Sequence, residues 1–393
     1  MSEHLMNTYG RQPVTFVRGE GAWLWDDKGE KYLDALSGVA VNGLGHAHPA
    51  LVRAISEQAA KLIHVSNIYQ IAEQARLADK LAEISGMDKV FFCNSGCEAN
   101  EAAIKLARLY GHNKGIESPE IIVMERAFHG RTMATLSATG NRKAQAGFEP
   151  LVSGFIRVPF DDLEAVRQVA SRNQNVVAIL VEPVQGEGGI NVPNDVKCYL
   201  QGLRQICDAH GWLLILDEVQ SGIGRTGTWF AFQHTEVMPD VMTLAKGLGS
   251  GVPIGACVAR GAAADVFTYG KHGSTFGGNP LASVAGLTTL EVIAHDKLRE
   301  NAENMGNQIC DLFRSELAGL SGVSNIRNAG LMIGVELDRP CGDLVRQALE
   351  QNLLINVTAD NVIRLLPPLV IQQNEASRIV EILAPLIRKF LGA

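Results

Sequence analysis

The sequence contains no long apolar run. Its longest clean apolar stretches are residues 176–181 and 212–216, whereas a membrane-spanning helix needs about 20 apolar residues. Residues 1–4 also lack the basic start and following apolar stretch of a signal peptide. The sequence therefore predicts neither a membrane span nor a signal peptide.

An excess of basic residues is absent too. The chain has 35 Lys and Arg against 42 Asp and Glu, a net charge of −7, which argues against general binding of nucleic acid. Small anionic substrates stay allowed, because a local basic pocket can lie in an acidic protein. The seven cysteines are odd in number and have no regular spacing, so we expect a reduced, cytoplasmic protein.

What is present is an alternating pattern. From residue 90 to residue 259, short β-branched runs alternate with longer helical stretches, which is typical of an α/β fold with a mostly parallel sheet. The expected strands are 90–93, 121–124, 155–158, 176–181, 213–216, 241–244 and 254–259. The expected helices between them are 98–110, 163–170 and 199–209.

The pattern changes after residue 280. Long amphipathic stretches at 282–294, 298–317 and 375–390 predict helices, and residues 331–337 and 362–366 predict strands. The 393 residues are long enough for two or three domains. We expect an N-terminal segment (1–45) that joins the small domain, a large domain (46–280) and a small α+β domain (281–393).

In an open α/β sheet, ligands bind beyond the carboxyl ends of the strands, so the residues after each strand are the candidates. Residues 94–101 open a helix with small residues, a pattern that binds phosphate or simply caps the helix through Asn94 or Ser95. No second Cys or His pair follows Cys93 and Cys97 at zinc spacing, so no metal is expected. Phe128 and Arg131 follow the next strand. They could stack on a planar ring and hold a carboxylate, or be a core Phe and a surface Arg.

Charged residues end three of the apolar strands. Glu182 and Asp217 each follow a solidly apolar run, where a carboxylate is costly unless it is paired or functional. Lys246 stands between an apolar strand and a Gly-rich turn. It is either a desolvated amine nucleophile or a lysine that reaches out to solvent from a strand end.

Taken together, these features match what pyridoxal phosphate requires. A helix start binds the phosphate, an aromatic ring stacks on the pyridine, a lysine forms a Schiff base, and an aspartate keeps the ring nitrogen protonated. The sequence therefore predicts this cofactor.

In their residues and in their order along the chain, six stretches resemble the class III pyridoxal-phosphate-dependent aminotransferases. They are residues 94–100, 128–131, 182–189, 216–224, 245–247 and 273–280. The resemblance extends from residues 38–49 to 364–368, nearly the whole chain. It implies fold type I, with a mostly parallel seven-stranded sheet in a large domain plus a smaller α+β domain. It also implies a homodimer with shared active sites.

The resemblance implies cofactor-binding roles for matching residues. Lys246 would form the Schiff base and serve as the general base. Asp217 would pair with the pyridinium nitrogen, Gln220 with the ring hydroxyl, and Phe128 and Val219 would cover the two ring faces. The rest of the expected cofactor-binding set is Ser95, Gly96, Cys97, His129 and, from the other subunit, Thr275. Position 97 is Thr in many family members, which leaves a side-chain role for Cys97 in doubt.

The resemblance implies substrate contacts as well. Arg131 would bind the carboxylate far from the reacting atom, and Arg364 the carboxylate beside it. Glu182 would pair with Arg364 when the amino donor is bound, and Ser274 would reach over from the other subunit.

The chain length and residues 38–49 most resemble the members that transfer the ω-amino group of N-acetylornithine to 2-oxoglutarate in arginine biosynthesis. Succinylornithine, ornithine and 4-aminobutyrate remain alternative donors. An aminomutase on the same fold needs no 2-oxoglutarate, and the pairing of Arg364 with Glu182 argues against it. A non-catalytic nucleotide-binding or scaffold protein would show no absorbance from bound cofactor.

Overall fold

The computed structural model describes residues 4–392, and within them a seven-stranded central sheet has the order β4-β10-β9-β8-β7-β5-β6. β10 runs antiparallel to β4 and β9, and the other neighbours are parallel. The predicted mostly parallel seven-stranded sheet is confirmed. Its strands are β4 (Lys89–Cys93), β5 (Glu120–Met124), β6 (Phe155–Val158), β7 (Val176–Val181), β8 (Leu213–Asp217), β9 (Val241–Leu244) and β10 (Gly255–Ala259).

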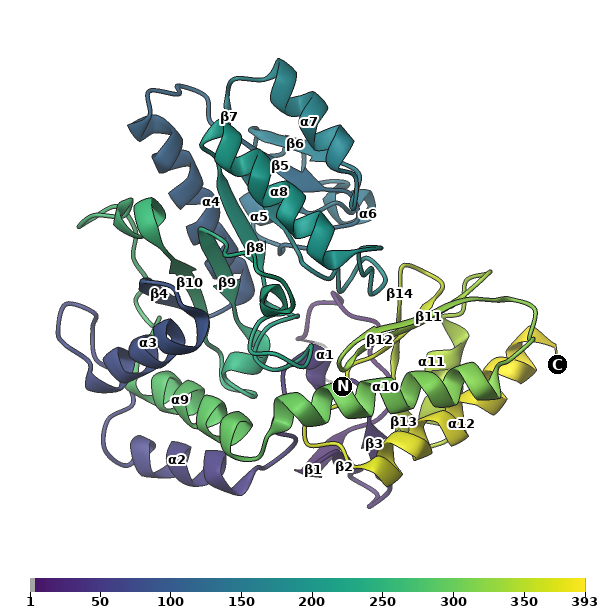
Figure 1. The fold of residues 1–393 in the computed structure, drawn as a ribbon. Helices are drawn as coiled ribbons and strands as arrows, with labels where there is room; N and C mark the ends of the chain where they lie inside the picture. Colours follow the sequence, from purple (N-terminus) through teal and green to yellow (C-terminus); the bar gives the residue numbers. More distant parts are fainter. Residues whose placement is uncertain (1–3, 393) are drawn as a thin grey trace.

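Helices cover both faces of the central sheet, because alternate residues of its buried strands point to opposite faces. Leu213 and Ile215 of β8 pack in one apolar cluster with helix α4 (Gly96–Asn113), whereas Leu214 and Leu216 pack in the other with α8 (Val196–His210). Figure 1 shows α8 lying across the strands in front and α4 beyond them. Solid apolar runs such as β7 therefore make a strand that is buried on both faces.

Other helices pack on one another beside the central sheet. α9 (Pro280–His295) packs against α2 (Pro49–Ala59) and α3 (Ala72–Ser85), and α7 (Leu163–Arg172) packs against α8. The shorter helices are α1 (Ser37–Ala40), α5 (Met133–Ala138), α6 (Arg142–Gln145), and the 3-10 turns Ala231–His234, Lys246–Leu248 and Gly261–Asp265.

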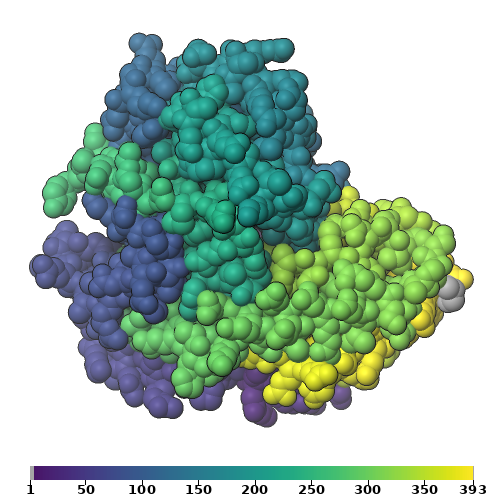
Figure 2. Space-filling view, viewed as in Figure 1, coloured from purple at the N-terminus to yellow at the C-terminus, as the bar shows by residue number. Residues whose placement is uncertain are grey.

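The C-terminal residues form a second lobe, seen in yellow-green and yellow beside the teal residues in Figure 2. Its four-stranded sheet, here the C-terminal sheet, has the order β11-β12-β15-β14. α10 (Leu298–Glu316) packs against α12 (Gln373–Leu391), and α10 also contacts this sheet. The other elements are α11 (Asp343–Leu349), β11 (Val323–Ala329), β12 (Met332–Leu337), β14 (Asn356–Thr358) and β15 (Val362–Leu365).

The N-terminal residues join this lobe through a third sheet. β1 (Phe16–Glu20), β2 (Trp23–Asp26) and β3 (Lys31–Asp34) form a meander, and β3 pairs in parallel with β13 (Leu353–Leu354). The sequence pattern predicts none of these four strands. The strands and helices that it does predict all occur, each within a few residues of its expected bounds. The division of the chain at residues 45 and 280 stays a prediction. Among residues 4–392, no helix combines the length and the apolar character that crossing a membrane requires.

Candidate active site

A cavity of about 350 Å³ lies beyond the carboxyl ends of β5, β7, β8 and β9. It brings together residues that are far apart in the sequence, because parallel strands end at the same edge of a sheet. The predicted site residues that line it are Ser95, Gly96, Cys97, Phe128, His129, Glu182, Asp217, Val219, Gln220 and Lys246. The individual roles of these residues stay predictions.

The start of α4 forms one wall of the cavity. Ser95 is the N-cap of this helix, and its Oγ accepts a hydrogen bond of 3.2 Å from the Glu98 amide. The first amides of a helix have no intrahelical acceptor and lie at the positive end of its dipole. A Cβ on Gly96 would come within 2.7 Å of Val219 Cγ1, so only glycine allows Val219 to pack this closely. Ser95 can therefore cap α4 through the Glu98 amide while other amides of the first turn bind an anion.

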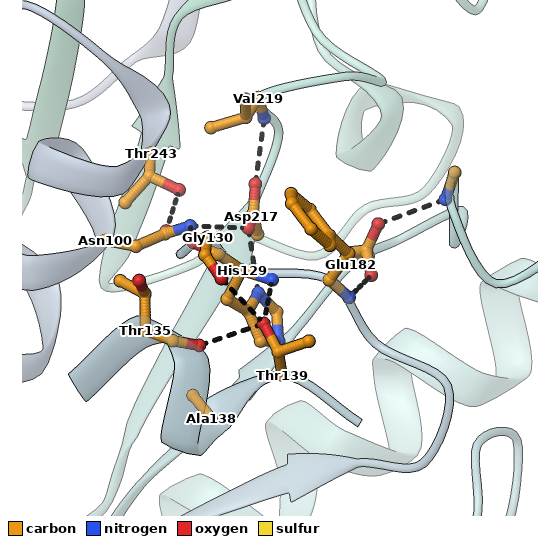
Figure 3. Close-up of polar contacts among 12 residues, drawn as sticks. Asn100, His129, Gly130, Thr135, Ala138, Thr139, Glu182, Asp217, Val219 and Thr243 are labelled. Carbon is orange, nitrogen blue, oxygen red and sulfur yellow. Dashed lines mark hydrogen bonds and ion pairs between the residues drawn. The ribbon is translucent and has the colours of Figure 1, made fainter. Parts of the chain in front are cut away.

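Asp217 ends β8 and is 4% exposed. Figure 3 shows the donors that surround its carboxylate. Oδ2 accepts from Asn100 Nδ2 at 2.7 Å and from His129 Nδ1 at 2.8 Å, and Oδ1 accepts from the Val219 amide at 3.0 Å. These donors offset the cost of burying a charge.

Lys246 follows β9 and lines the cavity rather than reaching outward. Its backbone has φ +41°, in the left-handed region that residues other than glycine seldom adopt. Residues with this conformation are often found at functional sites. Burial, followed by the positive charge of Arg364, lowers the pKa of this amine; Asp217, Glu182 and Glu187 oppose the shift without cancelling it. A lowered pKa makes the neutral, nucleophilic amine available at lower pH.

The structure corrects one predicted pairing. Arg364, on β15, is 1% exposed and forms an ion pair of 2.8 Å with Glu187, not with Glu182. Glu182 instead accepts hydrogen bonds from the Phe128 amide at 2.9 Å and the Gly186 amide at 3.0 Å. Both carboxylates belong to the turn after β7. Glu182 is the first residue after this strand, and its carboxylate accepts hydrogen bonds from nearby backbone amides.

Burial raises the pKa of Glu182 to about 7, although the His129 ring and the two amides act to lower it. Through its two hydrogen bonds, Glu182 connects the loop that carries Phe128 with the turn that carries Gly186. The side chain that faces Arg364 is that of Glu187.

The C-terminal sheet also holds the turn that carries Glu187. Arg327 of β11 donates to the carbonyl of Gly189 at 2.6 Å and to that of Ile190 at 2.8 Å, and the Thr358 hydroxyl donates to the Glu187 carbonyl. The turn is thus attached by its backbone independently of the Glu187 side chain.

Arg131 lies outside the cavity lining. It is exposed, and its guanidinium carbon lies 5.6 Å from the centre of the Phe128 ring. Its amide donates to Cys97 Sγ at 3.2 Å, so the thiol acts at this contact as an acceptor. The weaker donor strength of cysteine relative to threonine has no effect on that bond.

Ser274 and Thr275 lie on the connection between β10 and α9 and do not line the cavity. Ser274 Oγ is 3.4 Å from Asn94 Nδ2, and Thr275 is exposed. Their contribution to a partner's site stays a prediction.

Three functional candidates escape the sequence analysis. Glu187 lies in the turn 182–189 and Asn100 ends the stretch 94–100, so both had a motif that could have singled them out. Thr243, whose hydroxyl lies 2.7 Å from Asn100 Oδ1, had no such signal, because a single threonine in an apolar strand is common.

The profile of the family described as aminotransferase class-III matches residues 6–387. The chain belongs to the class III aminotransferases. An acetylornithine aminotransferase of Nitrosomonas europaea is 64% identical to it over 388 residues, which cover 99% of this chain and 98% of the relative.

Solved structures of this family have the same fold. An ornithine aminotransferase of Toxoplasma gondii has a TM-score of 0.94 at 35% identity, over 98% of this chain and 94% of that one. An acetylornithine aminotransferase of Elizabethkingia anophelis has a TM-score of 0.87 at 37% identity, over 98% and 97%.

Class III aminotransferases use pyridoxal phosphate, so this is the cofactor of the enzyme. The cavity fits it: the start of α4 suits a phosphate, and Lys246 suits an aldehyde. His129 Nε2 and Gln220 Oε1 are buried polar atoms with no protein partner, as expected where a polar ligand binds. No group of three or more His, Cys, Asp or Glu within residues 4–392 is arranged to hold a metal ion.

The electrostatics of Lys246 lead to a prediction for the cofactor-free protein. In competitive labelling with acetic anhydride, Lys246 should reach half-maximal reactivity at a lower pH than exposed lysines. Arg364→Gln removes a positive neighbour, so the protonated amine is favoured and this midpoint should move to higher pH. Arg346→Gln, which changes an exposed arginine paired with Glu350, is the control and should leave it unchanged. An unchanged midpoint in Arg364→Gln would refute the proposed coupling.

Proposed function

We propose that the enzyme transfers the ω-amino group of N-acetyl-L-ornithine to 2-oxoglutarate, giving N-acetyl-L-glutamate 5-semialdehyde and L-glutamate in arginine biosynthesis. The observation that carries this proposal is the 64% identity, over nearly the whole of both chains, to a relative named for this donor. The site supports it: the buried Arg364 pairs with Glu187, which lines the cavity, and the pKa of the neighbouring Lys246 amine is lowered.

When bound, pyridoxal phosphate supplies an aldehyde and a ring that accepts electrons. Lys246 would hold the aldehyde, and its free amine would be the general base that moves the substrate's proton. Asp217 would keep the ring nitrogen protonated. Phe128 and Val219 would cover the two faces of the ring, and Gln220 would bond its hydroxyl. The residues proposed for the phosphate are Ser95, Gly96, Cys97 and the Thr275 of a second subunit.

The pair of Arg364 and Glu187 lets one site accept two unlike substrates. N-acetylornithine has no carboxylate beside its reacting amine, and Glu187 then neutralises the buried Arg364. 2-Oxoglutarate has a carboxylate next to its reacting carbon, which replaces Glu187 as the partner of Arg364. An unpaired buried arginine would be costly in either half-reaction, so this exchange keeps the charge compensated. Arg131 serves the distal carboxylate that both substrates carry.

We propose that the enzyme is a homodimer with shared active sites. Two exposed segments lie together: Asn67 Nδ2 donates to the carbonyls of Ser274 at 2.9 Å and Gly277 at 3.0 Å. The same stretches of chain carry exposed apolar side chains: Leu62, Ile63, Ile68, Tyr69 and Phe276. Exposed apolar side chains suit a protein interface, and a two-fold contact here would bring Thr275 to a second copy's cavity.

We place the enzyme in the cytoplasm. All seven cysteines are free thiols, and five of them are buried, which suits a reducing compartment.

An ornithine aminotransferase is the second candidate, favoured by the TM-score of 0.94 to the Toxoplasma gondii structure. A substrate panel decides between the two. Acetylornithine, succinylornithine, ornithine and 4-aminobutyrate are each assayed with 2-oxoglutarate, and we expect the highest kcat/KM for acetylornithine. A higher kcat/KM for ornithine would replace the proposed donor and leave the family unchanged.

Removing the Arg364 guanidinium should affect the two half-reactions unequally. Loss of a buried charge pair costs about 2–5 kcal/mol, so Arg364→Ala should slow the 2-oxoglutarate half-reaction far more than the acetylornithine one. Arg131→Ala should slow both, because both substrates have a distal carboxylate. Single-turnover absorbance measurements of each half-reaction are the test, with Arg346→Ala as a surface control. Equal damage to both half-reactions by Arg364→Ala would contradict the partner exchange.

Mixed dimers test the shared sites. Each mixed dimer of a Lys246→Ala subunit and a Thr275→Ala subunit keeps one site with both residues intact, so activity should partly return. Lys246→Ala mixed with Asp217→Ala is the control: both residues line the cavity of one chain, so no site is intact. Absence of recovery in the first mixture, with mixed dimers shown to form, would mean that each site is built from one chain.

A further inference from the structure

Thr243 is fully buried on β9, where it is the parallel-strand neighbour of Asp217 on β8. Its backbone carbonyl accepts from the Glu218 amide at 3.0 Å, and its hydroxyl lies 2.7 Å from Asn100 Oδ1. An amide oxygen only accepts hydrogen bonds, so the hydroxyl is the donor. Thr243 is not among the residues that line the cavity.

This hydroxyl holds the Asn100 amide in the orientation that turns its NH₂ group toward Asp217. With Oδ1 held by Thr243, Nδ2 donates to Asp217 Oδ2 at 2.7 Å and to the His129 carbonyl at 2.8 Å. The reversed amide would place its oxygen against two other acceptors, the Asp217 carboxylate and the His129 carbonyl. Figure 3 shows this line of contacts from Thr243 through Asn100 to Asp217.

The contacts leave Asp217 little freedom. Oδ2 is held by Asn100 and by His129 Nδ1, and Oδ1 accepts only from the Val219 amide among these donors. His129 is itself anchored, since its amide donates to Thr139 Oγ1 at 3.0 Å. Because Oδ2 already has two donors, Oδ1 is the oxygen with capacity for a further one.

We propose that Thr243 is a positioning residue for the reaction: through Asn100 it orients the Asp217 carboxylate so that Oδ1 meets the ring nitrogen of the cofactor. The inference rests on the proposed role of Asp217 as the partner of that nitrogen. It assigns a task to a side chain that contacts neither the cavity nor any substrate.

The test uses variants that differ only in the donor at position 243. Thr243→Val keeps the shape and removes the hydroxyl, Thr243→Ser keeps the hydroxyl, and Thr243→Cys supplies a weaker donor. Thr289→Val is the matched control: Thr289 is also fully buried, but its hydroxyl donates to the Ala285 carbonyl within α9. Each purified holoenzyme is loaded with pyridoxal phosphate labelled with ¹⁵N in the ring.

Two quantities are measured: the ¹⁵N shift of the ring nitrogen, which reports its protonation, and the dissociation constant of the cofactor. Thr243→Val should move the shift toward the unprotonated value and weaken cofactor binding about tenfold, as loss of one buried hydrogen bond predicts. Thr243→Ser should match the unmodified enzyme. Thr243→Cys should lie between them, and it provides the test if Thr243→Val does not fold.

The result that overturns the inference is a Thr243→Val or Thr243→Cys enzyme with the same shift and dissociation constant as Thr289→Val. Asp217→Asn separates this failure from a failure of the proposed site. If Asp217→Asn loses the protonated signal while the Thr243 variants keep it, Asp217 has its proposed role and Thr243 does not position it. If Asp217→Asn keeps the signal, the role of Asp217 is wrong and the inference is overturned with it.

Discussion

Charge held away from water at the carboxyl edge of the central sheet is the constraint on which this site depends. Asp217, Glu182 and Lys246 line the cavity there, and Arg364 joins them from the C-terminal sheet through its ion pair with Glu187. An isolated buried ion is unstable by several kcal/mol. Each group is therefore compensated differently. Asp217 has three N–H donors, Glu182 has two backbone amides, Arg364 has Glu187, and Lys246 has a lowered pKa that favours its neutral form.

The parts of the site that sequence predicts well are those set by local pattern. A solid apolar run such as β7 or β8 is a buried strand, and a charged residue directly after it must lie at the sheet edge. That reasoning by itself places Asp217 and Lys246 at the same edge of the sheet. The start of α4 follows in the same way, because Ser95 and Gly96 form a capped helix start directly after β4.

The parts that sequence does not predict depend on contacts between distant elements. Glu182 and Glu187 share one turn, and only the position of β15 decides which of them faces Arg364. The hydrogen bond between Asn100 and Thr243 forms only because α4 packs against β9. The strands β1, β2 and β3 are short, and β3 finds its parallel partner more than 300 residues later, in β13.

The attachment of the turn at Glu187 has a mechanical consequence. Arg327 and Thr358 hold the backbone of this turn against the C-terminal sheet whether or not Glu187 touches Arg364. If the carboxylate partner of Arg364 changes as proposed, this backbone attachment does not depend on the change. The exchange then needs only a rotation of the Glu187 side chain, which is 42% exposed.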